Sequence, residues 1–74
     1  MCNDDGLASL DRQMASQFYS ARSRADPAER ALLERTRGRF LAYRDRCGSN
    51  ACMAAAYRDR MREISDIMAG RWRP

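Results

Sequence analysis

The residues best suited to chemistry in this sequence are two cysteines, Cys47 and Cys52, which are separated by four residues. The intervening Gly48-Ser49-Asn50-Ala51 contains signals for a helix stop and a helix start, so a reversal of the chain there would bring the two Cβ atoms within disulfide range. Zinc would need about four ligands, and a redox-active pair more often has the spacing Cys-x-x-Cys. The spacing therefore favours a structural disulfide, and closing so short a loop would contribute about 2 kcal/mol to stability.

Catalysis finds little support in the residue types. The sequence has no histidine, which excludes Ser-His and Cys-His nucleophilic arrangements, and it has no Gly-rich phosphate loop. Its carboxylates lie at predicted helix starts or on solvent faces, where capping and solvation explain them. We therefore expect neither an enzyme nor a protein that binds a metal or a cofactor.

Arg60 occupies the position that most needs explanation, because it falls inside the apolar arc of a predicted helix. An unpaired guanidinium there would carry a large desolvation cost. Two aspartates are candidate partners. Asp11 lies at the edge of the first apolar stripe, and Asp45 lies in the last turn of a helix, where a carboxylate opposes the helix dipole. Alternatively, the Arg60 side chain extends past its neighbours to water.

Three helices are predicted to position these residues, near 7–24, 27–47 and 51–69, followed by a tail at 70–74. The clearest local signal is Asp26-Pro27-Ala28-Glu29. It combines a capping box with a proline at the first helical position. The second helix is therefore expected to begin at this proline.

Glycines and short polar residues mark the other helix ends. Gly48 is expected to supply a left-handed stop for the second helix, and Gly70 a stop for the third. Ser49 or Asn50 is expected to cap the third helix at its start. In the tail, Trp72 either folds back on the helices or stays exposed as a contact residue.

Each predicted helix carries one apolar stripe. The stripes cover arcs of roughly 80°, 100° and 140° in chain order, so the third helix should be the most buried. They consist of Leu7, Leu10, Met14, Phe18 and Ala21; of Leu32, Leu33, Thr36, Phe40, Tyr43 and Cys47; and of Met53, Ala54, Tyr57, Met61, Ile64, Ile67 and Met68. Because short connections make sequential helices antiparallel, the predicted fold is all-α, a small antiparallel three-helix bundle with a disulfide at the corner between the second and third helices.

A chain of 74 residues forms one domain, and at this size the apolar core alone gives only marginal stability. The net charge of +4 raises the question of nucleic acid, since a basic three-helix domain is a plausible DNA-binding module. However, the exposed arginines of the third helix, Arg58 and Arg62, alternate with Asp59, Glu63 and Asp66. That helix offers no net positive face to phosphates, so we expect no nucleic-acid binding.

The cysteine content indicates an oxidising compartment. Three cysteines in so short a chain, two of them closely spaced, fit an exported protein better than the alternative, a cytosolic protein with free thiols. The sequence has no apolar run long enough to span a membrane and no signal-peptide core. We therefore expect that a targeting segment has been removed ahead of Met1.

Three motifs lie in order along the chain at 2–11, 40–47 and 52–61. They read Cys-Asn-Asp-Asp-Gly-Leu-Ala-Ser-Leu-Asp, Phe-Leu-Ala-Tyr-Arg-Asp-Arg-Cys and Cys-Met-Ala-Ala-Ala-Tyr-Arg-Asp-Arg-Met. In these motifs the chain resembles the LprI-type lysozyme-inhibitor family, small cysteine-containing helical domains of bacterial exported proteins and lipoproteins. The family pattern has an opening Cys followed by Leu-x-x-Leu-Asp, then Trp-Leu-x-x-Arg-Asp-x-Cys and Cys-Leu-x-x-x-Tyr-x-x-Arg. The chain departs from it at Phe40, where the family has tryptophan, and at Arg37, where it has glutamine.

The resemblance implies export to the periplasm or cell envelope, a helical fold, and inhibition of a lysozyme by protein–protein binding. The candidate contact residues are Asp45, Gly48, Ser49 and Asn50 at the corner and Trp72 in the tail. Family members carry a further cysteine upstream of the opening one. Cys2 has therefore either lost its disulfide partner or is the lipidated first residue of a lipoprotein. In the second case the lipid would be the chain's one attachment to a membrane. The alternative function is an envelope domain that contacts a different protein.

Overall fold

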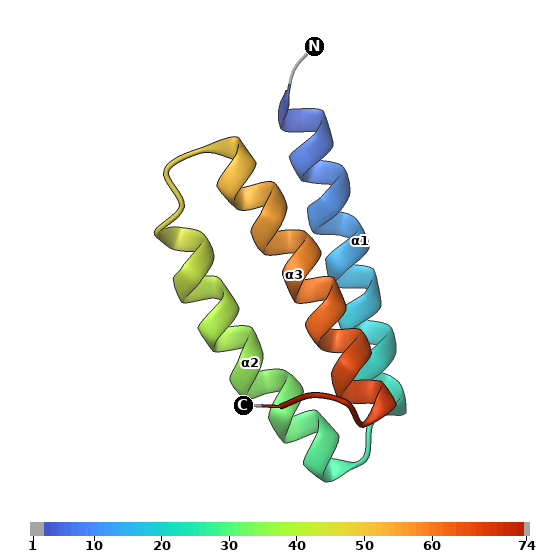
Figure 1. Ribbon diagram of the computed structural model, residues 1–74. Helices are drawn as coiled ribbons and strands as arrows, with labels where there is room; N and C mark the ends of the chain where they lie inside the picture. The colour runs from blue at the N-terminus through green and yellow to red at the C-terminus, as the bar shows by residue number, and fades with distance from the viewer. Residues whose placement is uncertain (1–2, 74) are drawn as a thin grey trace.

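The computed structural model of the chain describes the backbone of residues 3–73 and the side chains of residues 6–73. Three helices follow one another, α1 over Asn3–Arg24, α2 over Pro27–Asp45 and α3 over Asn50–Ala69. Sequential helices run antiparallel, and the described part of the chain contains no strand (Figure 1). The predicted all-α three-helix bundle is confirmed, with α1 beginning earlier than expected.

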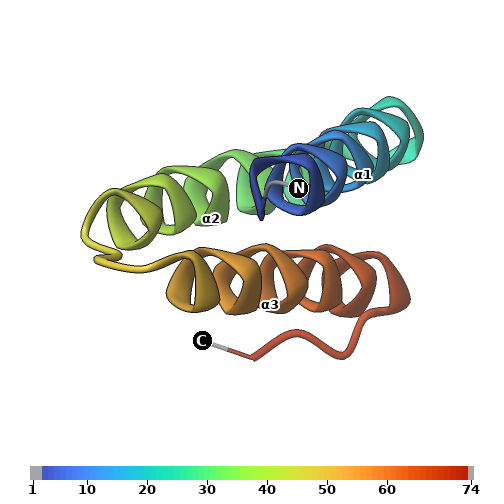
Figure 2. The same cartoon turned by 90° about the horizontal axis from the view of Figure 1, so that it is seen from above.

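The third helix is the one around which the other two pack. α3 contacts both α1 and α2 extensively, whereas α1 and α2 contact each other much less. Seen from the end of the bundle, α1 and α2 form one layer and α3 lies across it as a second layer (Figure 2). The wide apolar stripe of α3 explains why this helix packs against both others. As predicted, α3 buries more side chains than either α1 or α2.

The start of α2 follows the sequence signal closely. The Asp26 side chain accepts a hydrogen bond from the Glu29 backbone N–H at 2.8 Å, and the Glu29 side chain accepts one from the Asp26 N–H at 3.0 Å. Pro27 occupies the first helical position, where its missing N–H costs nothing. The predicted capping box is confirmed.

The end of α2 differs from the prediction. The helix ends at Asp45 with a tightened turn, in which the Arg46 N–H donates to the Tyr43 carbonyl at 3.1 Å and the Cys47 N–H to the Arg44 carbonyl at 3.0 Å. Among the described residues a positive φ occurs only at Gly70, so the expected left-handed stop at Gly48 was wrong. The earlier end lets Cys47 leave the helix and approach α3.

Both ends of α3 are set by local hydrogen bonds. The Ser49 hydroxyl accepts from the Cys52 N–H at 3.1 Å, so Ser49 is the cap and Asn50 is the first helical residue. Gly70 has φ 76°, and the Arg71 N–H donates to the Asp66 carbonyl at 2.8 Å. These bonds form a Schellman motif, which confirms the stop at Gly70 and turns the tail back along α3.

The core is divided into two apolar clusters. One consists of Phe18, Ala21, Ala25, Leu33, Ile64 and Ile67, and the other of Phe40, Ala56 and Tyr57. Thr36 on α2 and Arg60 on α3 come between the two clusters along their helices, and both are buried. A polar layer thus crosses the middle of the bundle, and Met14 of α1 packs against the cluster on either side.

Candidate functional site

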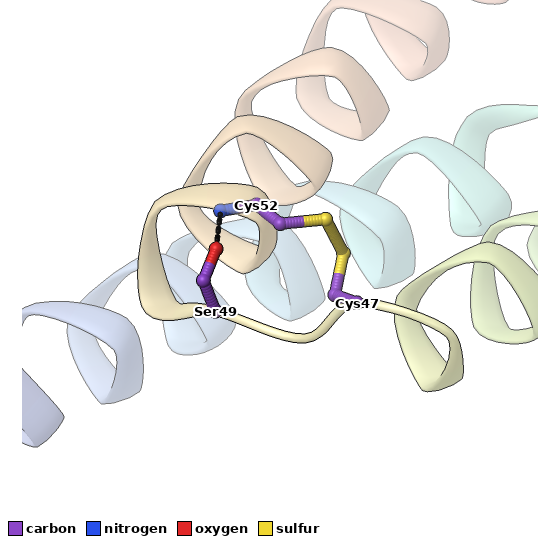
Figure 3. Close-up of a disulfide and its surroundings, with 3 residues drawn as sticks. All are labelled: Cys47, Ser49 and Cys52. Carbon is purple, nitrogen blue, oxygen red and sulfur yellow. Dashed lines mark hydrogen bonds between the residues drawn. A yellow bond between two sulfur atoms is a disulfide. The ribbon is translucent and has the colours of Figure 1, made fainter.

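The corner between α2 and α3 is closed by the predicted disulfide. Cys47 and Cys52 are joined, with their Cα atoms 5.5 Å apart, a separation in the ordinary range for disulfides (Figure 3). The Ser49 cap lies between them and fixes the first turn of α3. One covalent and one capping interaction therefore hold the same short loop.

The corner residues expected to contact a partner lie together on the surface. Asp45, Gly48, Ser49 and Asn50 are all exposed. The Asp45 carboxylate lies 3.5 Å from the Arg44 guanidinium. Burial lowers the pKa of Arg44, but the Tyr57 hydroxyl and the Asp45 carboxylate outweigh it and raise that pKa above its ordinary value. The corner thus offers a stapled loop with an exposed carboxylate.

Trp72 lies away from the corner and does not form a common surface with it. Its ring is half-buried against the first core cluster, and its Nε1–H donates to the Glu63 carboxylate at 3.0 Å. Glu63 lies thirteen residues beyond Asn50 on α3, which is about 20 Å along a helix. The tail passes over the outer side of α3, away from the layer of α1 and α2 (Figure 2). Of the two outcomes left open by the sequence, Trp72 therefore folds back.

Arg60 is the most unusual residue of the interior, since only 2% of its surface is exposed. Its guanidinium donates to the Thr36 hydroxyl at 2.7 Å, to the Leu33 carbonyl at 3.1 Å and to the Glu63 carboxylate at 3.0 Å. It also lies 5.6 Å from the centre of the Phe18 ring. Burial lowers the pKa of Arg60, and the Glu63 carboxylate offsets part of that effect. These contacts exclude the extension of Arg60 to water.

The prediction that Asp11 or Asp45 pairs with Arg60 was wrong. Neither Asp11 nor Asp45 forms an ion pair with Arg60 within the described residues, and Glu63 does so from the next turn of the same helix. Asp45 lies nine residues from Thr36 on α2, about 14 Å along the axis, which is too far to reach. Asp11 is exposed on α1. The spacing of three residues between Arg60 and Glu63 was the available signal, because such pairs lie on one helix face.

A groove between α2 and α3 has a volume of about 510 Å³. Its floor includes Thr36, Phe40, Ala56 and Arg60. Tyr43 stands at its edge and is 50% exposed, although its place in the apolar stripe predicted burial. The Tyr43 ring is therefore accessible from the groove.

The two walls of the groove have opposite charge. Arg39 of α2 and Arg46, which caps the end of α2, line one wall, and Asp59 and Glu63 of α3 line the other. Within the described residues, Arg39, Arg46 and Asp59 take part in no ion pair, and only Glu63 is engaged. The groove therefore has, among the described residues, unpaired charges of both signs on its walls. Sequence reasoning missed it, because helix periodicity does not report the distance between helices.

Several other findings bear on function. The described residues contain no group of three or more side chains able to hold a metal ion, and none of their helices combines the length and apolarity needed to cross a membrane. The pairing of Cys2 lies outside the described residues. A comparison of the chain with protein families, with curated proteins and with solved structures finds no match.

Proposed function

We propose that this chain is an exported helical module that binds another protein through its stapled corner, and that a lysozyme, which it would inhibit, is the partner implied by the resemblance. The observation that carries the proposal is the Cys47–Cys52 disulfide beside the exposed loop. Disulfides persist in oxidising compartments, which supports export. A loop fixed before binding loses little conformational entropy on contact with a partner, which supports a binding role.

Overall charge does not favour this encounter. Animal lysozymes are generally cationic, and the chain itself carries +4, so like charges slow association. Binding must therefore depend on a local contact, for which the exposed Asp45 carboxylate is suited. Trp72 is less suited than the corner, because its ring is half-buried and its Nε1–H is already bonded to Glu63.

A lysozyme activity titration tests the proposal. The oxidised protein should inhibit an animal lysozyme in a saturable manner, and reduction of the disulfide should weaken inhibition while circular dichroism still reports a helical chain. Asp45→Arg and Asn50→Arg should weaken inhibition as well. Ala55→Arg is the matched control, because it adds the same charge at an exposed position of α3 outside the corner.

The possible results separate the alternatives. Undiminished lysozyme activity at high concentrations of the oxidised protein would contradict inhibition by this chain and favour the other envelope role, contact with a different protein. Inhibition that is unchanged by reduction and by the corner variants would place the contact elsewhere on the chain.

A further inference from the structure

The geometry points to a second binding feature: the groove between α2 and α3 is a docking site for a short peptide segment of a partner protein, with an acidic side chain toward α2 and a basic one toward α3. This inference rests on the proposed protein-binding role, but it does not require a lysozyme. The observation behind it is the opposite charge of the two walls of the groove.

The two walls follow from helical spacing. Arg39 lies on α2 and Arg46 is the residue that caps its end, in a right-handed helical conformation. They are seven residues apart, which puts them on one face about two turns apart. Asp59 and Glu63 are four residues apart on α3 and also share a face. All four side chains line the same hollow. The groove thus has one cationic and one anionic rim along its length.

The charges on these rims are available to a ligand. Arg39, Arg46 and Asp59 are exposed, and within residues 6–73 none of their side chains forms a hydrogen bond or an ion pair. A peptide that placed a carboxylate against Arg39 and an ammonium or guanidinium against Asp59 would form two ion pairs at once. A peptide with the opposite arrangement would meet like charges on both sides, so the rims also fix its orientation.

The floor supplies an apolar contact between the charged rims. Phe40 and Ala56 are buried residues that border the hollow, and half of the Tyr43 surface is exposed beside them. An aromatic or aliphatic side chain of the segment would cover this floor and remove the tyrosine ring from water. Tyrosine is enriched among residues that contribute strongly to binding interfaces. The ligand therefore has three defined parts: an acid, an apolar centre and a base.

The size of the groove favours a segment over a second copy of the chain. Its volume of about 510 Å³ lies within the range of ligand pockets. From the level of Thr36 to Arg46 it runs about 15 Å, which matches about two to three turns of a helix or four to five extended residues. One end of the groove lies at Arg46, next to the corner. The other end lies at Glu63, whose carboxylate accepts the hydrogen bond from Trp72 of the tail. Such a bounded groove holds one segment.

The test uses the oxidised chain and a phage-displayed library of random short peptides. Peptides enriched on the immobilised protein should carry an acidic and a basic residue flanking an aromatic or aliphatic one. Their affinity, measured by fluorescence anisotropy, should fall about ten-fold or more for Arg39→Glu and for Asp59→Arg. Arg58→Glu makes the same charge change as Arg39→Glu, and Ala55→Arg adds a positive charge, both at exposed positions outside the groove. Both variants should leave affinity unchanged.

A compensating change provides the decisive comparison. Replacing the acidic residue of an enriched peptide by lysine should abolish binding to the original chain and restore binding to Arg39→Glu. No enrichment above empty wells, equal losses in the control variants, or failure of this compensation would overturn the inference. Self-association by sedimentation that Arg39→Glu abolishes would also overturn it and assign the groove to a second copy.

The outcome is separable from that of the proposed function. A chain that leaves lysozyme active but selects such peptides retains the groove and loses lysozyme as its partner. A chain that inhibits lysozyme but selects no such peptide retains the proposed function and loses the groove site.

Discussion

Arg60 of α3 donates a 2.7 Å hydrogen bond to the hydroxyl of Thr36 on α2, at the boundary between two apolar clusters. Thr36 in turn donates to the carbonyl of Leu32 at 2.8 Å. No buried side-chain nitrogen or oxygen among the described residues lacks a partner. The guanidinium is therefore tolerated in the interior because every polar group around it is bonded.

Arg60→Ala should lower the free energy of unfolding by roughly 2–4 kcal/mol, because it creates a cavity and leaves Glu63 without its cationic partner. Arg58→Ala should change it by less than about 0.5 kcal/mol, since Arg58 is exposed. Urea denaturation measures both. Equal effects of the two substitutions would mean that the Arg60 contacts contribute nothing to stability.

A volume-conserving change separates packing from polarity at the same position. Arg60→Met should cost less than Arg60→Ala, because the methionine fills the space and Thr36 keeps its bond to Leu32. Thr36→Val, by contrast, removes an acceptor from a charged donor and should cost about 1–3 kcal/mol. If Thr36→Val proved neutral in the same urea experiment, the bond between the two helices would have no energetic importance.

Two glycine substitutions should have opposite signs. Gly70 has φ 76°, so Gly70→Ala should cost about 1–2 kcal/mol even though the space around it is open. Gly38 lies inside α2, and an added Cβ there meets no atom within 4 Å, so Gly38→Ala should stabilise the chain by about 0.5–1 kcal/mol. Thermal unfolding gives both values. A stabilising Gly70→Ala would contradict the left-handed end of α3.

The tail contact can be followed through the only tryptophan of the chain. Trp72→Phe removes the bond to Glu63 and should cost about 1 kcal/mol. Glu63→Ala should move the tryptophan emission to longer wavelength, because the ring is no longer held against the core. The helical signal in circular dichroism should change little in Trp72→Phe. An unaltered emission spectrum in Glu63→Ala would show that the ring is held by packing alone.

The disulfide should contribute about 2 kcal/mol, so the free energy of unfolding of the double variant Cys47→Ser, Cys52→Ser, measured by urea denaturation, should be lower by that amount. Ser49→Ala should cost about 1 kcal/mol through loss of the cap. Mass spectrometry of a non-reduced digest checks the pairing directly. A free thiol at either position in the air-oxidised chain would contradict the closed corner.

The parts of this fold that the sequence predicted are those decided by neighbouring residues. The capping box at Asp26, the stop at Gly70 and the cap of α3, for which Ser49 was one of two candidates, each depend on chemistry within one helical turn. The prediction that Gly48 ends α2 was wrong, because a tightened turn ends the helix earlier, at Asp45. The presence of a glycine after Cys47 does not reveal that earlier end.

The candidate site was predicted less well, because it depends on how helices pack. Periodicity placed Arg60 in the core, but the choice among nearby carboxylates required the positions of α1 and α2. Glu63 was the one partner that a spacing rule could have found. The exposed Tyr43 and the groove beside it depend on how α2 and α3 pack together, which no pattern within a single helix encodes.

Amide hydrogen exchange of the oxidised chain, with and without a saturating animal lysozyme, tests most directly whether this module binds that enzyme through its corner. Binding should slow exchange at residues 46–50 and leave the exposed middle of α1 unaffected. Identical exchange in the two samples, or protection confined to α1, would contradict the proposed function.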